Sequence, residues 1–189
     1  MERIILASAS PRRKQLLEWA EIPFDLLVKE TDELYPSTLA IDQVPVYIAR
    51  NKALAVKYEL NHNRIILAAD TIVVLNDDVI NKPANREIAI ETLAKLSGQT
   101  HQVITGVVLL NGDEEISFRD ITEVEFHTLT LLQIQYYVDQ YQPYDKAGAY
   151  AIQEWIGVIG IKKITGDFYN VMGLPVSRVV KALQDFQNQ

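Results

Sequence analysis

The sequence is constrained most by an apolar run, residues 65–75, that contains a single carboxylate. Only Asp70 and Thr71 interrupt a series of isoleucine, leucine, alanine and valine residues, which predicts a buried β-strand. A carboxylate inside such a strand is costly unless it is hydrogen-bonded, paired with a cation or bound to a metal. We therefore expect Asp70 to have a functional role. The alternative is a carboxylate that faces solvent at a bulge, since Thr71 also breaks the apolar run.

Strand and helix patterns alternate along the rest of the chain. Apolar segments predict strands at residues 3–7, 24–28, 79–80, 103–110, 149–152 and 157–164, and a return strand that ends near residue 126. Apolar periodicity and capping residues predict helices that begin at Ser10-Pro11 and helices over residues 42–60, 86–96, 130–140 and 174–186. The Asn111-Gly112 pair predicts an antiparallel hairpin. Because hairpins and helical crossovers both occur, we expect an α/β fold with a mixed sheet.

Composition restricts the class of protein further. The 189 residues are 48% hydrophobic and carry a net charge of −7, without repeats or low-complexity segments, which predicts one globular domain over residues 1–189. The acidic balance argues against nucleic acid or an anionic membrane as a partner. The absence of cysteine and of a long apolar segment favours a cytoplasmic protein. Three histidines, His62, His101 and His127, lack metal-ligand spacing and are expected to be structural or exposed.

A hydroxyl- and arginine-rich segment follows the first predicted strand. Residues 8–13 place Ser8, Ser10, Arg12 and Arg13 around the start of a helix, where free backbone N–H groups and guanidinium forks attract phosphate oxygens. The alternative is an ordinary capped helix whose arginines are solvated or contact acidic loops.

Two lysines and an acidic loop are weaker candidates for the site when each is taken alone. Lys52 and Lys82 are charged residues of a type that is usually solvated, and the acidic loop at residues 30–33 could supply a carboxylate to magnesium.

Several segments resemble, in the same order, the Maf-like nucleoside triphosphate pyrophosphatases. The resemblance covers nearly the whole chain and rests on residues 8–13 (SASPRR) with Leu16-Leu17, 68–73 (AADTIV), 82–83 (KP), 96–103 (LSGQTHQV), 145–153 (DKAGAYAIQ) and 173–175 (GLP). The segment at 145–153 is similar to that of the branch that acts on dTTP and UTP. Members similar to this branch usually follow the glutamine with glycine, whereas here Glu154 follows Gln153.

The resemblance implies an elongated mixed sheet flanked by helices, similar to the inosine triphosphatase fold, with two lobes around a cleft and assembly as a homodimer. It also implies hydrolysis of a nucleoside triphosphate to the monophosphate and pyrophosphate with a divalent metal, Mg²⁺ or Mn²⁺. By position, the phosphate-binding and active-site residues would be Ser8, Arg12, Arg13, Glu33, Lys52, Asp70 and Lys82. The residues at positions associated with base choice are Arg12, Thr71 and Gln153.

The chemistry of such a reaction agrees with these residue types. Cleavage between the α and β phosphates requires cations that spread the triphosphate charge, a metal and a base for water. We hypothesise that Glu33 and Asp70 bind the metal and that Asp70 accepts the proton of the attacking water. The phosphates would be held by four cationic side chains, those of Arg12, Arg13, Lys52 and Lys82. The Gln153 amide offers a donor and an acceptor, which suits the imide edge shared by thymine and uracil.

These observations predict an enzyme that removes surplus or non-standard pyrimidine triphosphates, with dTTP and UTP as substrates. Two alternatives stay open. The chain could be a non-catalytic regulator of cell division that binds nucleotide, since the name of the resembled family derives from a septation phenotype. It could also perform the same chemistry on a purine or modified-base triphosphate, because Glu154 departs from the pattern next to Gln153.

Overall fold

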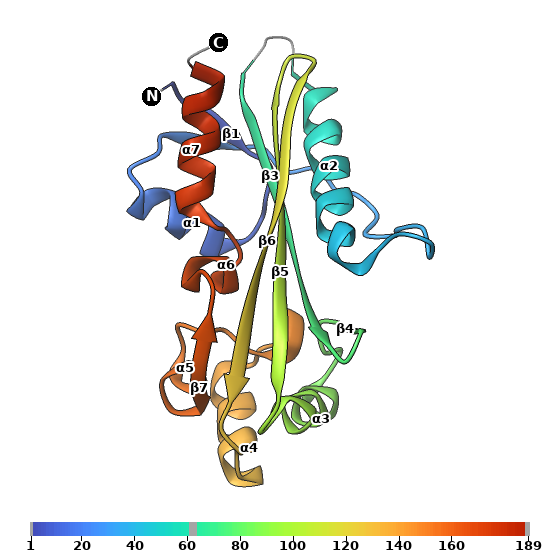
Figure 1. Cartoon of the computed structure of the whole chain (residues 1–189), viewed down its shortest axis with the longest axis vertical. Helices are drawn as coiled ribbons and strands as arrows, with labels where there is room; N and C mark the ends of the chain where they lie inside the picture. Colours follow the sequence, from blue (N-terminus) through green and yellow to red (C-terminus); the bar gives the residue numbers. More distant parts are fainter. Residues whose placement is uncertain (1, 61–63, 188–189) are drawn as a thin grey trace. The chain divides into compact units, whose positions relative to one another are not determined.

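The computed structural model describes residues 2–60 and 64–187 (Figure 1). Within these residues, seven strands form one mixed sheet in the order β2-β1-β3-β5-β6-β7, and β4 pairs with β3. The strands are β1 (Ile4–Leu6), β2 (Phe24–Leu26), β3 (Ile66–Leu75), β4 (Asp78–Ile80), β5 (Thr100–Asn111), β6 (Glu114–Phe126) and β7 (Ile161–Thr165). β1 runs parallel to β2 and β3, whereas β3 with β4 and β6 with β7 are antiparallel. The predicted α/β class with a mixed sheet is therefore confirmed.

The helices are α1 (Pro11–Trp19), α2 (Val44–Lys57), α3 (Arg86–Leu96), α4 (Leu131–Tyr141), α5 (Trp155–Gly160), α6 (Phe168–Met172) and α7 (Val176–Gln187), with 3₁₀ turns η1 (Ile41–Gln43) and η2 (Ala147–Ala149). Helices α1, α2, α3, α4 and α7 lie close to where the sequence predicts helices, whereas α5 and α6 were not predicted. No helix in the described part of the chain has both the length and the apolar character that a membrane span requires. Of the three histidines, His62 lies outside the described residues.

The chain divides into two compact units. One consists of Met1–Asp70, Thr105–Asp120 and Gly173–Gln189, and the other of Thr71–Ile104 and Ile121–Met172. Strands β3, β5 and β6 each contribute residues to both units. The single domain over residues 1–189, and the cleft that the resemblance implies, stay predictions.

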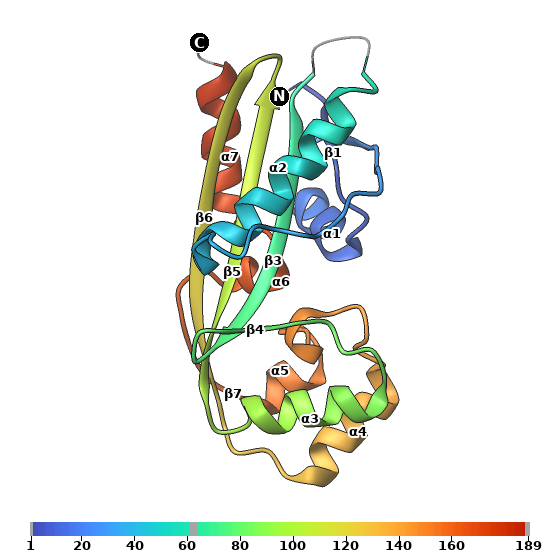
Figure 2. The same cartoon turned by 90° about the vertical axis from the view of Figure 1, so that its right-hand side faces the viewer.

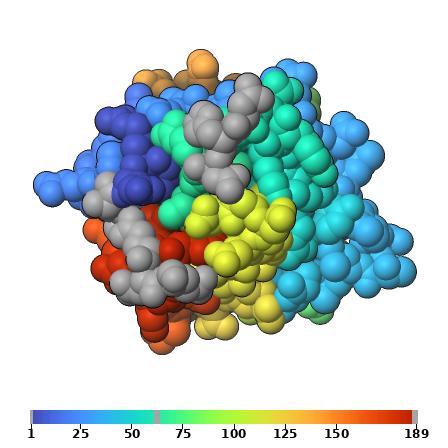
Figure 3. Space-filling view, turned by 90° about the horizontal axis from the view of Figure 1, so that it is seen from above, coloured from blue at the N-terminus to red at the C-terminus, as the bar shows by residue number. Residues whose placement is uncertain are grey.

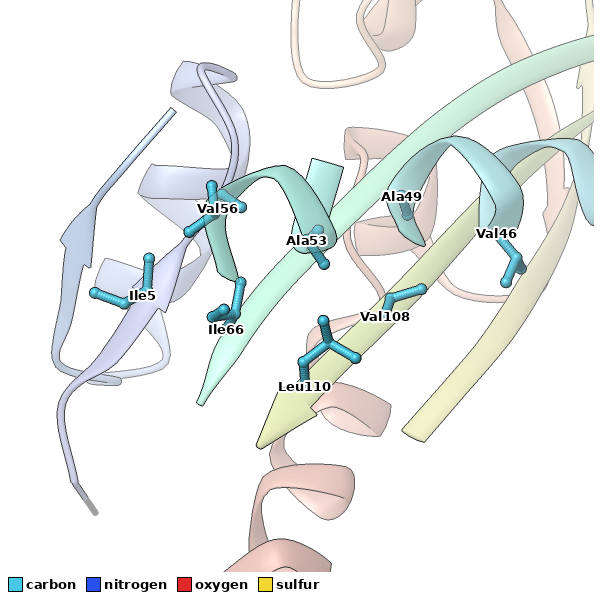
Figure 4. Close-up of a cluster of buried hydrophobic side chains, with 10 residues drawn as sticks. Ile5, Val46, Ala49, Ala53, Val56, Ile66, Val108 and Leu110 are labelled. Carbon is cyan, nitrogen blue, oxygen red and sulfur yellow. The ribbon is translucent and has the colours of Figure 1, made fainter. Parts of the chain in front are cut away.

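The core of the first unit lies between α2 and the strands. Val46, Ala49, Ala53 and Val56 recur on one face of α2 with helical spacing and are buried. Figure 4 shows these side chains turned toward apolar residues of β1, β3 and β5. The helix approaches β5 closely at Gly106, where a Cβ atom would lie 2.2 Å from the backbone nitrogen of Val46. Glycine is required there because any side chain would meet the backbone of α2.

The same unit contains α7, which packs against β6. Figure 3 views it from the end at which the β5–β6 hairpin lies beside α7 and the N-terminal residues. Arg178 of α7 donates to the Arg119 carbonyl and to the Asp120 carboxylate of β6, both at 2.7 Å, and its guanidinium lies 4.4 Å from the centre of the Phe118 ring. These contacts attach the C-terminal helix to β6.

In the second unit, α3 and α4 lie side by side (Figure 2). The Arg86 guanidinium near the start of α3 donates to both carboxylate oxygens of Asp139 on α4, at 2.6 and 2.9 Å. The tight turn between β3 and β4 consists of Asn76 and Asp77, which both have positive φ, at 51° and 66°. Two left-handed residues match the twist of a hairpin, and Asn and Asp tolerate that conformation better than most residues.

One predicted strand is wrong, and a second is right only in its later half. Residues 149–152 form the end of η2 and a turn, and residues 157–164 are divided between α5 and β7. Gly157 explains the second difference, because a Cβ atom on it would lie 1.8 Å from the Ile152 carbonyl oxygen. The short apolar segment is therefore a helix that packs directly on the backbone of the preceding turn. Periodicity alone does not separate a short buried helix from a strand.

Candidate active site

The first site feature is the start of α1, where Arg13 is buried. Ser10 caps the helix by accepting from the Arg13 backbone N–H at 3.5 Å, and Pro11 follows in the first turn, as the sequence predicts. The Arg13 guanidinium donates through Nε to the Gly173 carbonyl at 2.8 Å and through Nη1 to Ser8 Oγ at 3.1 Å. Ser8 Oγ also accepts from the Ser10 backbone N–H at 3.3 Å. The side chains of Ser8 and Arg13 are thus brought together and held in one orientation.

The charge of Arg13 is affected by the other predicted site residues. Burial lowers the pKa of its guanidinium, the Asp70 carboxylate raises it, the neighbouring Arg12 lowers it and Glu33 raises it. An arginine stays protonated despite such effects, because its ordinary pKa lies far above neutrality. Asp70 and Glu33 are therefore close enough to the start of α1 to change the pKa of Arg13 by their charge.

The second site feature is a lysine between two carboxylates. Lys52 lies on α2, Asp70 lies in β3 with 9% of its surface exposed, and Glu33 lies in the acidic loop after β2. Lys52 Nζ donates to Asp70 Oδ1 at 2.6 Å and to Glu33 Oε1 at 2.8 Å. Of the ways in which a buried carboxylate can be stabilised, the structure shows pairing with a cation, and β3 continues through Asp70 into Thr71 without a break. The alternative, a carboxylate that faces solvent at a bulge, is therefore wrong for Asp70.

The positions of the Glu33 and Asp70 carboxylates suit the binding of a magnesium ion. Glu33 and Asp70 come from separate segments, yet one oxygen of each lies within hydrogen-bond distance of the same nitrogen. Mg²⁺ commonly takes one or two protein carboxylates and completes its shell with water and substrate phosphates. Among the residues that the structure describes, no group of three or more His, Asp or Glu side chains could hold a metal ion alone. The donor set therefore fits a metal that arrives with a phosphate ligand.

The remaining predicted residues occupy separate positions. Arg12 is half-buried beside Arg13 on α1, and Thr71 follows Asp70 in β3 and is also half-buried. Lys82 is exposed in the segment between β4 and α3. Gln153 is exposed in a turn before α5. Thr71, Lys82 and Gln153 belong to the second unit, whereas Ser8, Arg12, Arg13, Glu33, Lys52 and Asp70 belong to the first.

The structure adds residues that the sequence patterns did not assign to a site. The carbonyl of Gly173 orients Arg13, and Gly173 was identified only as part of the motif at residues 173–175. In the second unit, Tyr137 and Lys146 contact Glu154, next to Gln153. The Glu154 departure was the only sequence signal for that contact. His101 is buried against Tyr150, with its Nε2 2.7 Å from the tyrosine oxygen, and His127 is exposed, as expected of structural and surface histidines.

Known proteins are similar to this chain over nearly its whole length. A family model described as Maf-like protein matches residues 3–186. The chain belongs to the Maf-like protein family. A Maf relative from Cytophaga hutchinsonii, named dTTP/UTP pyrophosphatase, is 54% identical over 98% of this chain and 84% of its own length. Another from Parabacteroides distasonis has the same name and is 47% identical over 97% of this chain and 96% of its own. The solved Ham1 protein of Staphylococcus aureus is more remote, at 15% identity over 66% of this chain and 72% of that one, with a TM-score of 0.47.

Proposed function

We propose that this Maf-family chain hydrolyses dTTP and UTP to the nucleoside monophosphate and pyrophosphate. The names and near-complete coverage of the similar relatives support this activity. The observation that carries it is the contact of Lys52 with Asp70 and Glu33, in the electrostatic field that also acts on Arg13. Cations and carboxylates held together in this way suit a reaction in which a polyanion must bind near a base.

Phosphate binding is assigned to Ser8 and the cationic side chains. Arg13 is held by Ser8 and by the Gly173 carbonyl, so its guanidinium loses little further freedom when it binds an anion. Arg12 lies next to it at the start of α1, where backbone N–H groups also favour phosphate oxygens. Lys52 supplies a further charge beside Asp70, and phosphate binding is proposed for Lys82 as well.

Water attack is assigned to Asp70. Its carboxylate is the base that accepts the proton of the water as the bond between the α and β phosphates breaks. Glu33 and Asp70 would hold Mg²⁺ or Mn²⁺ together with phosphate oxygens, and that ion would polarise the α-phosphoryl group. Lys52 orients the Asp70 carboxylate through the 2.6 Å contact and offsets the charge of both carboxylates before substrate binds.

Base choice is assigned to Arg12, Thr71 and Gln153. The exposed amide of Gln153 can donate to and accept from the imide edge that thymine and uracil share. Cytosine presents a different donor and acceptor order on that edge, so a site built for the imide group rejects it.

Two further proposals concern the state of the protein. We place it in the cytoplasm, where nucleoside triphosphates are found, in agreement with its lack of cysteine. We also propose a homodimer, whose mass sedimentation equilibrium would measure directly against the 21.4 kDa of one chain.

The activity is tested by pyrophosphate release from the purified protein with Mg²⁺ and, separately, Mn²⁺. The substrates are dTTP, UTP, dCTP, CTP, ATP, GTP and modified-base triphosphates. Selective release from dTTP and UTP is expected. Release from none of them, with the protein shown to be folded by circular dichroism, would favour a nucleotide-binding regulator instead. Selective release from a purine or modified-base triphosphate would retain the reaction and replace the substrate.

A further inference from the structure

The turn that carries Gln153 is closed by its own backbone. The Glu154 N–H donates to the Ala151 carbonyl at 3.1 Å, and Gln153 lies between these two residues. Ala151 and Ile152 are buried at 4% exposure, whereas Gln153 is exposed. Burial of the first half of the turn therefore anchors it in the second unit while the amide of Gln153 stays accessible.

Tyr137 ties the two ends of this turn together. Its ring is buried on α4 and stacks on Tyr141 at a centroid distance of 4.9 Å. The Tyr137 hydroxyl accepts from the Ala151 backbone N–H at 3.1 Å and donates to Glu154 Oε2. A single hydroxyl thus uses its acceptor and its donor on the residues that flank the turn. Because the tyrosine is fixed by packing, the turn takes its position from α4.

Lys146 supplies the charge that balances Glu154. Its side chain is only 11% exposed, and its Nζ lies 2.8 Å from Asp145 Oδ1 and 3.7 Å from Glu154 Oε1. A buried ammonium needs a nearby carboxylate to offset its desolvation. Glu154 is itself 22% exposed in its side chain, whereas Asp145 is 63% exposed. Glu154 is therefore the less solvated of the two counter-charges, and it connects Lys146 to the turn.

We propose that Glu154, through Tyr137 and Lys146, is a positioning residue that holds Gln153 and so sets the discrimination between bases. This inference rests on the proposed pyrophosphatase activity. A side chain that reads hydrogen-bonding groups must be held within about 0.5 Å of its working position. A looser turn lets Gln153 reach the edge of cytosine as well as that of thymine, so selectivity falls while phosphate chemistry, assigned to other segments, continues.

The test compares kcat and KM on dTTP and dCTP for the wild-type chain and five variants. Glu154→Ala removes the acceptor and the charge, and Tyr137→Phe removes the hydroxyl while keeping the ring. Each is expected to lower the dTTP preference by about tenfold, mainly through a higher KM for dTTP, with kcat within about threefold. Glu154→Gln keeps an oxygen that can accept from Tyr137 and should retain more of the preference than Glu154→Ala. Combining Glu154→Ala with Tyr137→Phe should cost less than the sum of the two single losses, because both changes remove the same Tyr137–Glu154 hydrogen bond.

Asp139→Asn is the matched control. Asp139 lies on the same helix as Tyr137, and its substitution by asparagine removes the charge and one of the two acceptors used by Arg86, without removing a contact of the turn. Its dTTP preference should equal that of the wild type. The inference is overturned if folded Glu154→Ala and Tyr137→Phe keep the wild-type preference, or if they lose activity equally on both bases. If the wild-type chain releases pyrophosphate from neither substrate, the proposed function itself is overturned. The wild-type measurement therefore distinguishes failure of the proposed function from failure of this inference.

Discussion

Lys52 Nζ lies 2.6 Å from the Asp70 carboxylate in β3, and it lies 2.8 Å from Glu33 as well. One ammonium thus holds two carboxylates that are far apart in the sequence. Asp70 is almost fully buried, and Lys52 is the cation that forms an ion pair with it. The arrangement allows the proposed base, Asp70, and its partner Lys52 to be tested separately.

Asp70→Asn should lower the turnover of dTTP by ~10²-fold or more with little change in thermal stability. An asparagine oxygen can still accept from Lys52, but the amide cannot take a proton from water. Pyrophosphate release and the midpoint of thermal unfolding measure the two effects. Full activity in this variant would exclude Asp70 as the base.

Lys52→Met should lower the free energy of unfolding by roughly 1–3 kcal/mol, because it leaves the Asp70 carboxylate without its cation in a buried strand. Adding Asp70→Asn should recover part of that loss, which urea denaturation of the single and double variants would measure. Lys14→Met is the control, since the Lys14–Glu18 pair is exposed and 3.7 Å long. Strictly additive losses would show that Lys52 and Asp70 do not stabilise each other.

Gln153→Ala should erode the preference for dTTP and UTP over dCTP and CTP more than it lowers kcat on dTTP. The reason is that the amide is assigned to the base, while the phosphates are assigned to other side chains. Steady-state kinetics on the four substrates measure the ratio. Equal losses on every base would refute the role of Gln153.

The folded protein should lose stability in mild acid because of His101. Burial lowers the pKa of His101 to about 4, so below its ordinary value of 6.5 the unfolded chain binds a proton that the folded chain does not. Stability is therefore complete above pH 6.5 and falls as the pH is lowered toward 4. Between pH 7.5 and 5.0 the loss is about 2 kcal/mol. Urea denaturation of wild type and His101→Gln at both pH values measures it, and an identical loss in the two proteins would contradict this assignment.

Gly106→Ala should be among the most damaging single-methyl changes in the first unit. The added Cβ would lie 2.2 Å from the Val46 nitrogen and 2.3 Å from the Pro45 carbonyl carbon, which are backbone atoms that cannot move aside. We expect a loss of about 3 kcal/mol in the free energy of unfolding. Gly160→Ala is a suitable control, since its nearest contact is the flexible end of Leu129 at 3.1 Å. Equal stability of the two variants would mean that α2 can shift away from β5.

Local patterns were sufficient for much of the fold. The predicted helix over residues 86–96 coincides with α3, and the hairpin predicted at Asn111-Gly112 joins β5 to β6, with Asn111 as the last residue of β5. Ser10 caps α1, with Pro11 in its first turn. These features depend on apolar periodicity and on backbone preferences within a few residues of each position, so they are visible in the sequence. Residues 149–152 and 157–160 were wrongly predicted as strands, whereas 161–164 do lie in β7. At Gly157 the chain packs on the Ile152 carbonyl, a contact that only the folded chain provides.

For the candidate site, too, the sequence determined some features and the tertiary structure decided others. The sequence alone determined which residues are chemically capable, since a carboxylate inside the apolar run of β3 and paired arginines at a helix start are unusual wherever they lie. Only the tertiary structure decided their partners: Lys52 for Asp70, the Gly173 carbonyl for Arg13 and the Tyr137 hydroxyl for Glu154. Hydrogen bonds and ion pairs act over about 3 Å. Residues that are 17 to 160 positions apart come within that distance only when the core is packed.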